Sequence, residues 1–186
     1  MATVESDATI GVQDRVLSAA EQVVIRDGVA NLTLEAVARE AGMSKGGLLY
    51  HFRSKSELII AIVDRLGKRC ESEHAKSLSE AQPPKGAFTR AYIAARASGP
   101  DPQKRPFLTA LLAAAGTNQD YLEPIRERAR KWQSMLESDG IDPATATVIR
   151  LAIDGLCLCS LFGLPVPDGD LRQDVIQKLI DMTKEG

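Results

Sequence analysis

Apolar residues recur every three or four positions along most of the chain, and no long segment alternates apolar and polar positions. The first stripe contains Val16, Val23 and Val24, and it ends before Gly28. This spacing gathers apolar side chains on one face of an α-helix, which must pack against other helices. The pattern therefore predicts an all-α fold of about nine helices.

Start and stop signals divide the following segment into short helices. Thr33 is a suitable N-cap for a helix that Gly42 can end, and Ser44 can cap another helix after a short turn. Ser54 and Glu57 have the spacing of a capping box, which predicts a longer helix after them. Two short helices joined by a glycine-containing turn are typical of a helix-turn-helix.

Turn-forming segments divide the rest of the chain at AQPPKG, SGPDPQKRP and FGLPVPDGD. Between them the periodicity predicts helices at 86–98, 105–117, 119–138, 143–163 and 170–184. The helix at 143–163 is apolar around nearly its whole circumference, so both of its sides must be covered. We expect a flexible arm at 1–11, a helix-turn-helix DNA-binding domain at 12–55, and an effector-binding and dimerisation domain at 56–186.

Charge narrows the search for a functional surface. The 186 residues carry a net charge of -2, so a nucleic-acid contact would need a local basic patch. The segment from Ser44 to Lys55 provides one, because it contains basic residues and no carboxylate. Lys55 opens the predicted next helix, where exposed backbone N–H groups favour a phosphate.

Two adjacent glycines, Gly46 and Gly47, lie in the second short helix of this segment. Each glycine costs a helix interior roughly 1 kcal/mol relative to alanine, so helix stability does not explain the pair. A residue without Cβ lets the backbone approach base edges and phosphates closely. The alternative interpretation is that the glycines only tolerate a bend.

The stretch TLEAVAREAGMSKGGLLYHFRSKSELI resembles the DNA-binding domain of the TetR family of bacterial transcriptional regulators. The resemblance covers about residues 12 to 66. It implies that the second short helix meets base edges and that its flanks contact phosphates. Glu35 stands where many relatives carry an arginine that reaches DNA, which places that contact in doubt. The DNA-contacting set implied by the resemblance is Thr33, Ser44, Lys45, Gly46, Gly47, Leu49, Tyr50, His51 and Lys55.

The resemblance also implies a homodimeric repressor that leaves double-stranded operator DNA when a small molecule enters the C-terminal domain. The large residues expected around the ligand are Phe88, Tyr92, Phe107, Leu111, Trp132 and Met135. None of these residues is charged, which favours an apolar or weakly polar effector. The apolar helix and the last helix are expected to form the dimer contact, through Ala152, Leu156, Cys159, Val175 and Leu179.

Other classes of function receive less support. Cys70 and His74 are spaced as two metal ligands, but two ligands do not make a site. Cys157 and Cys159 could act as a redox switch between subunits, although cysteine on an apolar helix is usually a small hydrophobe. We expect no enzyme activity and no cofactor, since no phosphate loop or paired nucleophile and base is present. An all-α adaptor that binds only protein stays open.

The expected location is the cytoplasm. The start MATVESDATI lacks the features of a signal peptide, and no apolar run has the length and purity of a membrane span.

Overall fold

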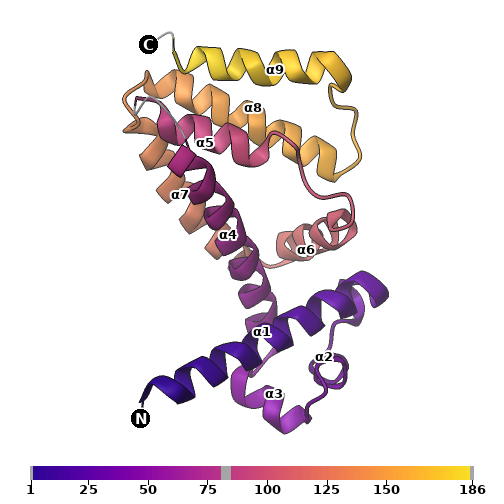
Figure 1. The fold of residues 1–186 in the computed structure, drawn as a ribbon. Helices are drawn as coiled ribbons and strands as arrows, with labels where there is room; N and C mark the ends of the chain where they lie inside the picture. Colours follow the sequence, from indigo (N-terminus) through magenta and orange to yellow (C-terminus); the bar gives the residue numbers. More distant parts are fainter. Residues whose placement is uncertain (1, 81–84, 185–186) are drawn as a thin grey trace. The chain divides into compact units, whose positions relative to one another are not determined.

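The computed structural model describes residues 2–80 and 85–184, and within these ranges it contains α-helices, two short 3-10 helices and no strand (Figure 1). The all-α prediction is confirmed. In chain order the elements are α1 (Ala2–Asp27), η1 (Val29–Asn31), α2 (Leu34–Glu40), α3 (Lys45–His51), α4 (Lys55–Glu80), α5 (Ala87–Arg96), α6 (Arg105–Thr117), η2 (Gln119–Leu122), α7 (Glu123–Glu137), α8 (Pro143–Leu161) and α9 (Gly169–Met182).

Two compact units make up the chain. The first comprises Met1–Leu66 and Pro106–Pro124, and the second comprises Gly67–Arg105 and Ile125–Gly186. The first twelve residues of α4 belong to the first unit, because Leu58 and Ile62 are buried in its core. This division differs from the expected boundary at residue 55.

The core of the first unit is built from the predicted helical stripes. Val16 and Val23 of α1 are fully buried, as are Leu48 of α3 and Ile62 of α4. Buried side chains of α6 join the same cluster. The core therefore fixes the two short helices against α1 and α4.

Local capping sets the ends of the two short helices as predicted. The Thr33 hydroxyl accepts the backbone N–H of Ala36 at 3.1 Å, and the Ser44 hydroxyl accepts that of Gly47 at 3.1 Å. Gly42 has a φ of 62°, the left-handed conformation that ends a helix and that glycine adopts at little cost. These caps confirm the helix-turn-helix geometry of α2 and α3.

Helices α5, α8 and α9 lie side by side in the second unit (Figure 1). Its core contains Ile93, Leu136, Ile149 and Ile153, all nearly fully buried. The Asp139 carboxylate, which follows α7, caps the N-terminus of α5. Its oxygens accept the backbone N–H groups of Phe88 at 3.0 Å and of Thr89 at 2.7 Å.

Two local predictions were wrong. Residues 1–11 were expected to form a flexible arm, but α1 begins at Ala2, and no proline interrupts the segment before residue 12. The single helix expected at 119–138 is divided into η2 and α7. Asn118 caps η2 by accepting the N–H of Asp120, and α7 then begins at Glu123 with Pro124 in its first turn.

Helix α8 is long and apolar enough to cross a membrane by length and composition alone, with a mean hydropathy of 1.6. Its sequence nevertheless carries Arg150 and Asp154, and one face is buried in the second unit through Ala146, Ile149, Ile153 and Leu161. These features fit a helix that packs on protein at least as well as they fit a membrane span.

Candidate nucleic-acid interface and effector region

Helix α3 turns one face into the core and the other to solvent. Leu48 and Phe52 are buried, whereas Tyr50 is 83% exposed and Leu49 is 36% exposed. Lys45 and Gly46 are also exposed. The outward face thus carries the Lys45 ammonium, the Tyr50 hydroxyl and backbone without a side chain at Gly46. These groups can contact a polyanion while the core stays as it is.

The two glycines occupy ordinary right-handed helix, so the backbone conformation does not require them. A Cβ added at Gly46 would come no closer than 4.0 Å to another side chain, the Ser44 hydroxyl. A Cβ at Gly47 would lie 3.3 Å from Met43 Cε and 3.3 Å from Ser44 Oγ. Internal packing therefore offers a partial reason for Gly47 and none for Gly46.

An ion pair joins the two helices of the helix-turn-helix. The Lys45 ammonium donates to the Glu35 carboxylate, and both side chains are more than half exposed. This contact holds the pKa of Glu35 below its usual value. The resemblance places Lys45 at the DNA, but one N–H of its ammonium is already donated to Glu35.

Lys55 is less available than its position in the sequence suggested. Its ammonium donates to the carbonyl oxygens of Val29 at 3.1 Å and Ala30 at 3.4 Å, and the side chain is half-buried. The cation thus satisfies carbonyl groups of η1. One N–H of the ammonium is left to donate to a phosphate, so the DNA contact through Lys55 stays a prediction.

Replacing Glu35 with glutamine should raise the affinity for DNA of any sequence. Lys45 would lose its carboxylate partner and could neutralise one more phosphate, so the slope of log affinity against log salt should steepen by about one. Binding measured by fluorescence anisotropy across a salt series checks this. Glu40→Gln is the matched control, because Glu40 lies on the same helix and pairs with Arg26 at 2.8 Å. An unchanged slope in Glu35→Gln would remove Lys45 from the interface.

Three of the predicted effector residues meet in the second unit. The rings of Tyr92 and Trp132 are perpendicular, with centroids 5.5 Å apart, and His74 lies 4.2 Å from Phe88 and 5.7 Å from Trp132. All four side chains are buried. Burial lowers the pKa of His74, whose Nε2 lies 3.2 Å from the Phe88 carbonyl oxygen.

Polar groups that the sequence analysis missed border this aromatic cluster of His74, Phe88, Tyr92 and Trp132. The Arg96 guanidinium carbon lies 3.8 Å from the Tyr92 ring centroid and 4.3 Å from that of Trp132. The Tyr92 hydroxyl donates to Asp154 at 2.6 Å. Burial is the main cause that raises the pKa of Tyr92. Arg96 lies four residues after Tyr92, and that helical spacing was the available signal.

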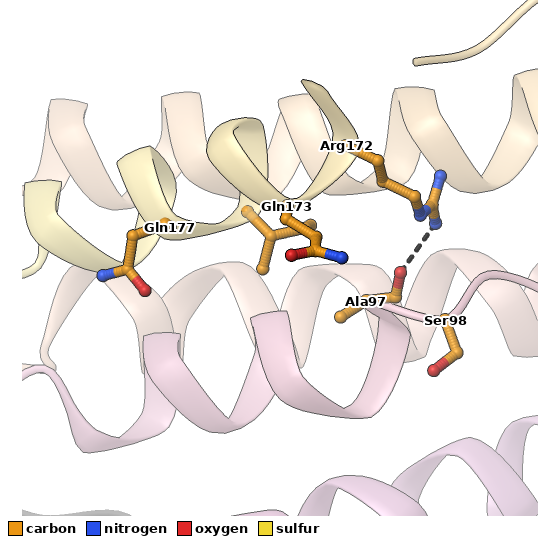
Figure 2. A pocket seen from close by; sticks show the side chains of 6 residues that line it. Ala97, Ser98, Arg172, Gln173 and Gln177 are labelled. Atoms are coloured by element: carbon orange, nitrogen blue, oxygen red, sulfur yellow. Dashed lines mark hydrogen bonds between the residues drawn. The ribbon is translucent and has the colours of Figure 1, made fainter. Parts of the chain in front are cut away.

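The other predicted effector residues lie elsewhere. Phe107 and Leu111 are buried in the core of the first unit, and Met135 is 40% exposed on α7. An open groove between α5 and α9 contains none of the six. It is lined by Ala97, Ser98, Arg172, Gln173, Ile176 and Gln177, and Figure 2 shows the Arg172 guanidinium reaching the Ala97 carbonyl, at 2.6 Å.

Helix α8 also presents an apolar face to solvent. Val148, Leu151, Leu158 and Phe162 are 49–57% exposed, and their spacing of three, seven and four residues places them on one stripe. Leu171 on α9 is 61% exposed. We call Val148, Leu151, Leu158 and Phe162 the α8 stripe.

The predicted dimer residues are less exposed than the α8 stripe. Ala152, Leu156 and Val175 pack against the core of the second unit, and Leu179 is buried in it. Cys159 is half-buried. The periodicity could not choose between the faces because nearly every face of α8 is apolar.

The cysteines give no support to a metal site. Among the described residues there is no group of three or more His, Cys, Asp or Glu side chains placed to hold a metal ion. The Cys157 thiol lies 3.7 Å from the Arg96 carbonyl oxygen, to which it can donate. That carbonyl belongs to the last residue of α5, so this cysteine helps to satisfy a helix end.

Comparison with known families decides the class of protein. The family model "Bacterial regulatory proteins, tetR family" matches residues 16–62, and the model "Tetracyclin repressor-like, C-terminal domain" matches residues 86–184. The chain belongs to the TetR family. It is therefore a DNA-binding transcriptional regulator, and the resemblance read from the helix-turn-helix segment is confirmed.

Individual relatives of this TetR-family chain support the same assignment. The HTH-type transcriptional regulator TtgR of Pseudomonas putida is 34% identical over 68 residues, which are 37% of this chain and 31% of that protein. The chain thus matches less than a third of that relative's length. The structure of SCO7518 from Streptomyces coelicolor A3(2) has a TM-score of 0.73 at 22% identity and covers 92% of this chain and 98% of its own.

A second solved structure is that of the multidrug binding protein EbrR complexed with ethidium. It has a TM-score of 0.65 at 24% identity, covering 90% of this chain and 98% of its own. At these identities the two structures establish the shared fold.

Proposed function

We propose that this TetR-family regulator is a homodimeric repressor that leaves its operator when a small molecule enters the second unit. The observation that carries the proposal is the outward face of α3, where Lys45, Gly46 and Tyr50 are exposed. No carboxylate lies between Ser44 and Lys55. The repressor acts in the cytoplasm, where bacterial DNA lies, and it needs no cofactor to bind DNA.

The α8 stripe supports the dimer. An exposed row of large apolar side chains is costly in water and marks a protein contact. Two copies of the stripe related by a two-fold axis would cover each other, since such an interface is self-complementary. A dimer then presents two α3 helices to half-sites roughly 34–36 Å apart, one turn of DNA.

The aromatic cluster supports an effector site in the second unit. Flat aromatic walls with a few polar groups are typical of small-molecule sites. The related fold of EbrR is that of a multidrug binding protein, which was solved with ethidium bound. An effector that prefers one form of the chain shifts the population away from the form that binds the operator.

The test is the migration of DNA fragments from both sides of the chain's own gene with purified protein. We expect retardation of one fragment at protein concentrations that leave scrambled DNA of equal length free. Lys45→Met should weaken this binding. Equal retardation of every fragment would contradict an operator-specific repressor.

Absence of any retardation would favour the all-α adaptor. An adaptor that binds only protein would need the α8 stripe but would have no use for the basic face of α3.

A further inference from the structure

We propose that the effector site is formed by Tyr92, Arg96 and Trp132 and that it accepts a flat carboxylate, which Arg96 binds through its guanidinium group. The inference rests on the proposed function for the role of the ligand as effector. It replaces the apolar or weakly polar effector expected from the sequence with an anionic one.

The first observation is an unsatisfied buried donor. Arg96 Nη1 is buried and has no hydrogen-bond acceptor among the residues that the structure describes. Within the same residues no carboxylate forms an ion pair with Arg96, and its guanidinium rests on the faces of Tyr92 and Trp132. Buried polar groups in native proteins nearly always have partners, and this N–H of Arg96 is able to donate to a ligand that stacks on the same rings.

The missing acceptor does not by itself distinguish Arg96, because the Nε atoms of Arg65, Arg105 and Arg150 are also buried without one, but Arg65 and Arg128 each have a carboxylate partner. Arg65 pairs with Glu21 and donates to the Ser18 hydroxyl at 3.1 Å. Arg128 pairs with Glu71 at 3.1 Å. Arg96 differs from Arg65 and Arg128 because no carboxylate among the described residues pairs with it and its guanidinium rests on two aromatic rings.

The charges around the cluster favour an anion over a cation. Asp154, the carboxylate that borders Tyr92, already accepts from the Tyr92 hydroxyl at 2.6 Å and pairs with Arg150 at 3.5 Å. A cationic ligand stacked on Tyr92 or Trp132 would lie beside the Arg96 guanidinium, and the two like charges would repel each other. An anionic ligand would instead supply the missing acceptor.

The shape of the cluster favours a flat carboxylate. A guanidinium offers two parallel N–H groups to one carboxylate, and aromatic ring faces stack on planar molecules. The backbone of the α5 end is held by the Cys157 thiol on the Arg96 carbonyl and by Arg172 on the Ala97 carbonyl. An entering ligand would therefore displace the Arg96 side chain rather than the helix. His74 of α4 lines the same cluster, so the helix shared by both units would sense the ligand.

The test uses three probes of one shape and different charge: 2-naphthoate, 2-naphthamide and 2-naphthamidine. Calorimetric titration of the full chain should show that 2-naphthoate binds at least about tenfold more tightly than the amide and the amidine, because only its carboxylate is an anion that offers Arg96 two acceptor oxygens. Arg96→Met should lower naphthoate affinity at least about tenfold, and Arg96→Lys should lower it less. Arg130→Met is the control, since Arg130 is an exposed arginine of the same unit, and it should bind like the parent.

Several outcomes would overturn the proposal. They are equal binding of the three probes, tighter binding of the amidine, no binding of 2-naphthoate up to its solubility limit, and unchanged naphthoate affinity in a folded Arg96→Met or Arg96→Lys chain. Circular dichroism and melting temperature verify the fold of each variant, and Arg96→Lys decides the matter if Arg96→Met does not fold.

A gel shift with and without 2-naphthoate separates this proposal from the proposed function. If naphthoate binds through Arg96 but does not release DNA, the ligand site is supported and its regulatory role is contradicted. If a different compound releases the parent and Arg96→Met from DNA equally well, the repressor function is supported and the proposed effector site is refuted.

Discussion

Replacing Leu151 with arginine should convert the proposed dimer into monomers and lower operator affinity by roughly 100-fold or more, because a monomer contacts one half-site only and loses the chelate gain of two. Leu151 is 57% exposed in the α8 stripe, so the change should leave the monomer folded. In the dimer the new charge would be buried against apolar side chains without a partner, which is strongly unfavourable. Sedimentation velocity and operator titration on the same preparation measure both effects.

Two further variants sharpen this prediction. Ser134→Arg places the same charge at an exposed position of α7, outside the stripe, and should remain dimeric. Leu156→Arg, which the sequence alone offered as an interface change, should instead lower the melting temperature, because Leu156 packs on the core of the second unit. A dimer that survives arginine at both Leu151 and Leu158 would place the interface elsewhere.

Replacing Gly46 with leucine should abolish operator binding while the chain remains a folded dimer. The position is exposed right-handed helix with open space around a new Cβ, so the fold can accept a side chain. The added atoms would stand between the α3 backbone and the DNA. Gly46→Ala should stabilise the fold by about 0.4–1 kcal/mol through the unfolded state and still weaken binding.

Stability and affinity should therefore move in opposite directions at Gly46. The control is Gly116→Ala, since Gly116 is also helical and its new Cβ would have no neighbour within 4 Å. It should give a similar gain in stability without any loss of affinity. Gly47 is the poorer test because its Cβ would press on Met43 and on the Ser44 cap. Operator binding of Gly46→Leu equal to that of the parent would refute the close approach of backbone and DNA.

The sequence by itself determined the features that depend on near neighbours. Thr33, Gly42 and Ser44 set helix ends through contacts with residues at most five positions away, so their identity and spacing were enough. The buried faces of α1 and α4 followed from the 3.6-residue period. The helix-turn-helix, the TetR-family resemblance and the all-α fold rest on such local signals.

Only the tertiary structure decided which distant residues share a site. Phe107 and Tyr92 were both expected around the effector, yet Phe107 lies in the core of the first unit and Tyr92 in that of the second, because periodicity shows that a residue is buried and not which cluster it joins. The Lys55 ammonium donates to carbonyl groups 25 and 26 positions away, and the Lys45 ammonium donates to Glu35. No local pattern encodes such pairings.

Helix α8 and Arg96 show most clearly what a local sequence pattern does not determine. A helix that is apolar all round has no face that its period can select, so packing against α5 and α9 chose the buried side and left Leu151 in solvent. Arg96 looked like an ordinary basic residue at a helix end. Helix packing placed Trp132 of α7 beside it and enclosed a guanidinium N–H that has no acceptor among the described residues.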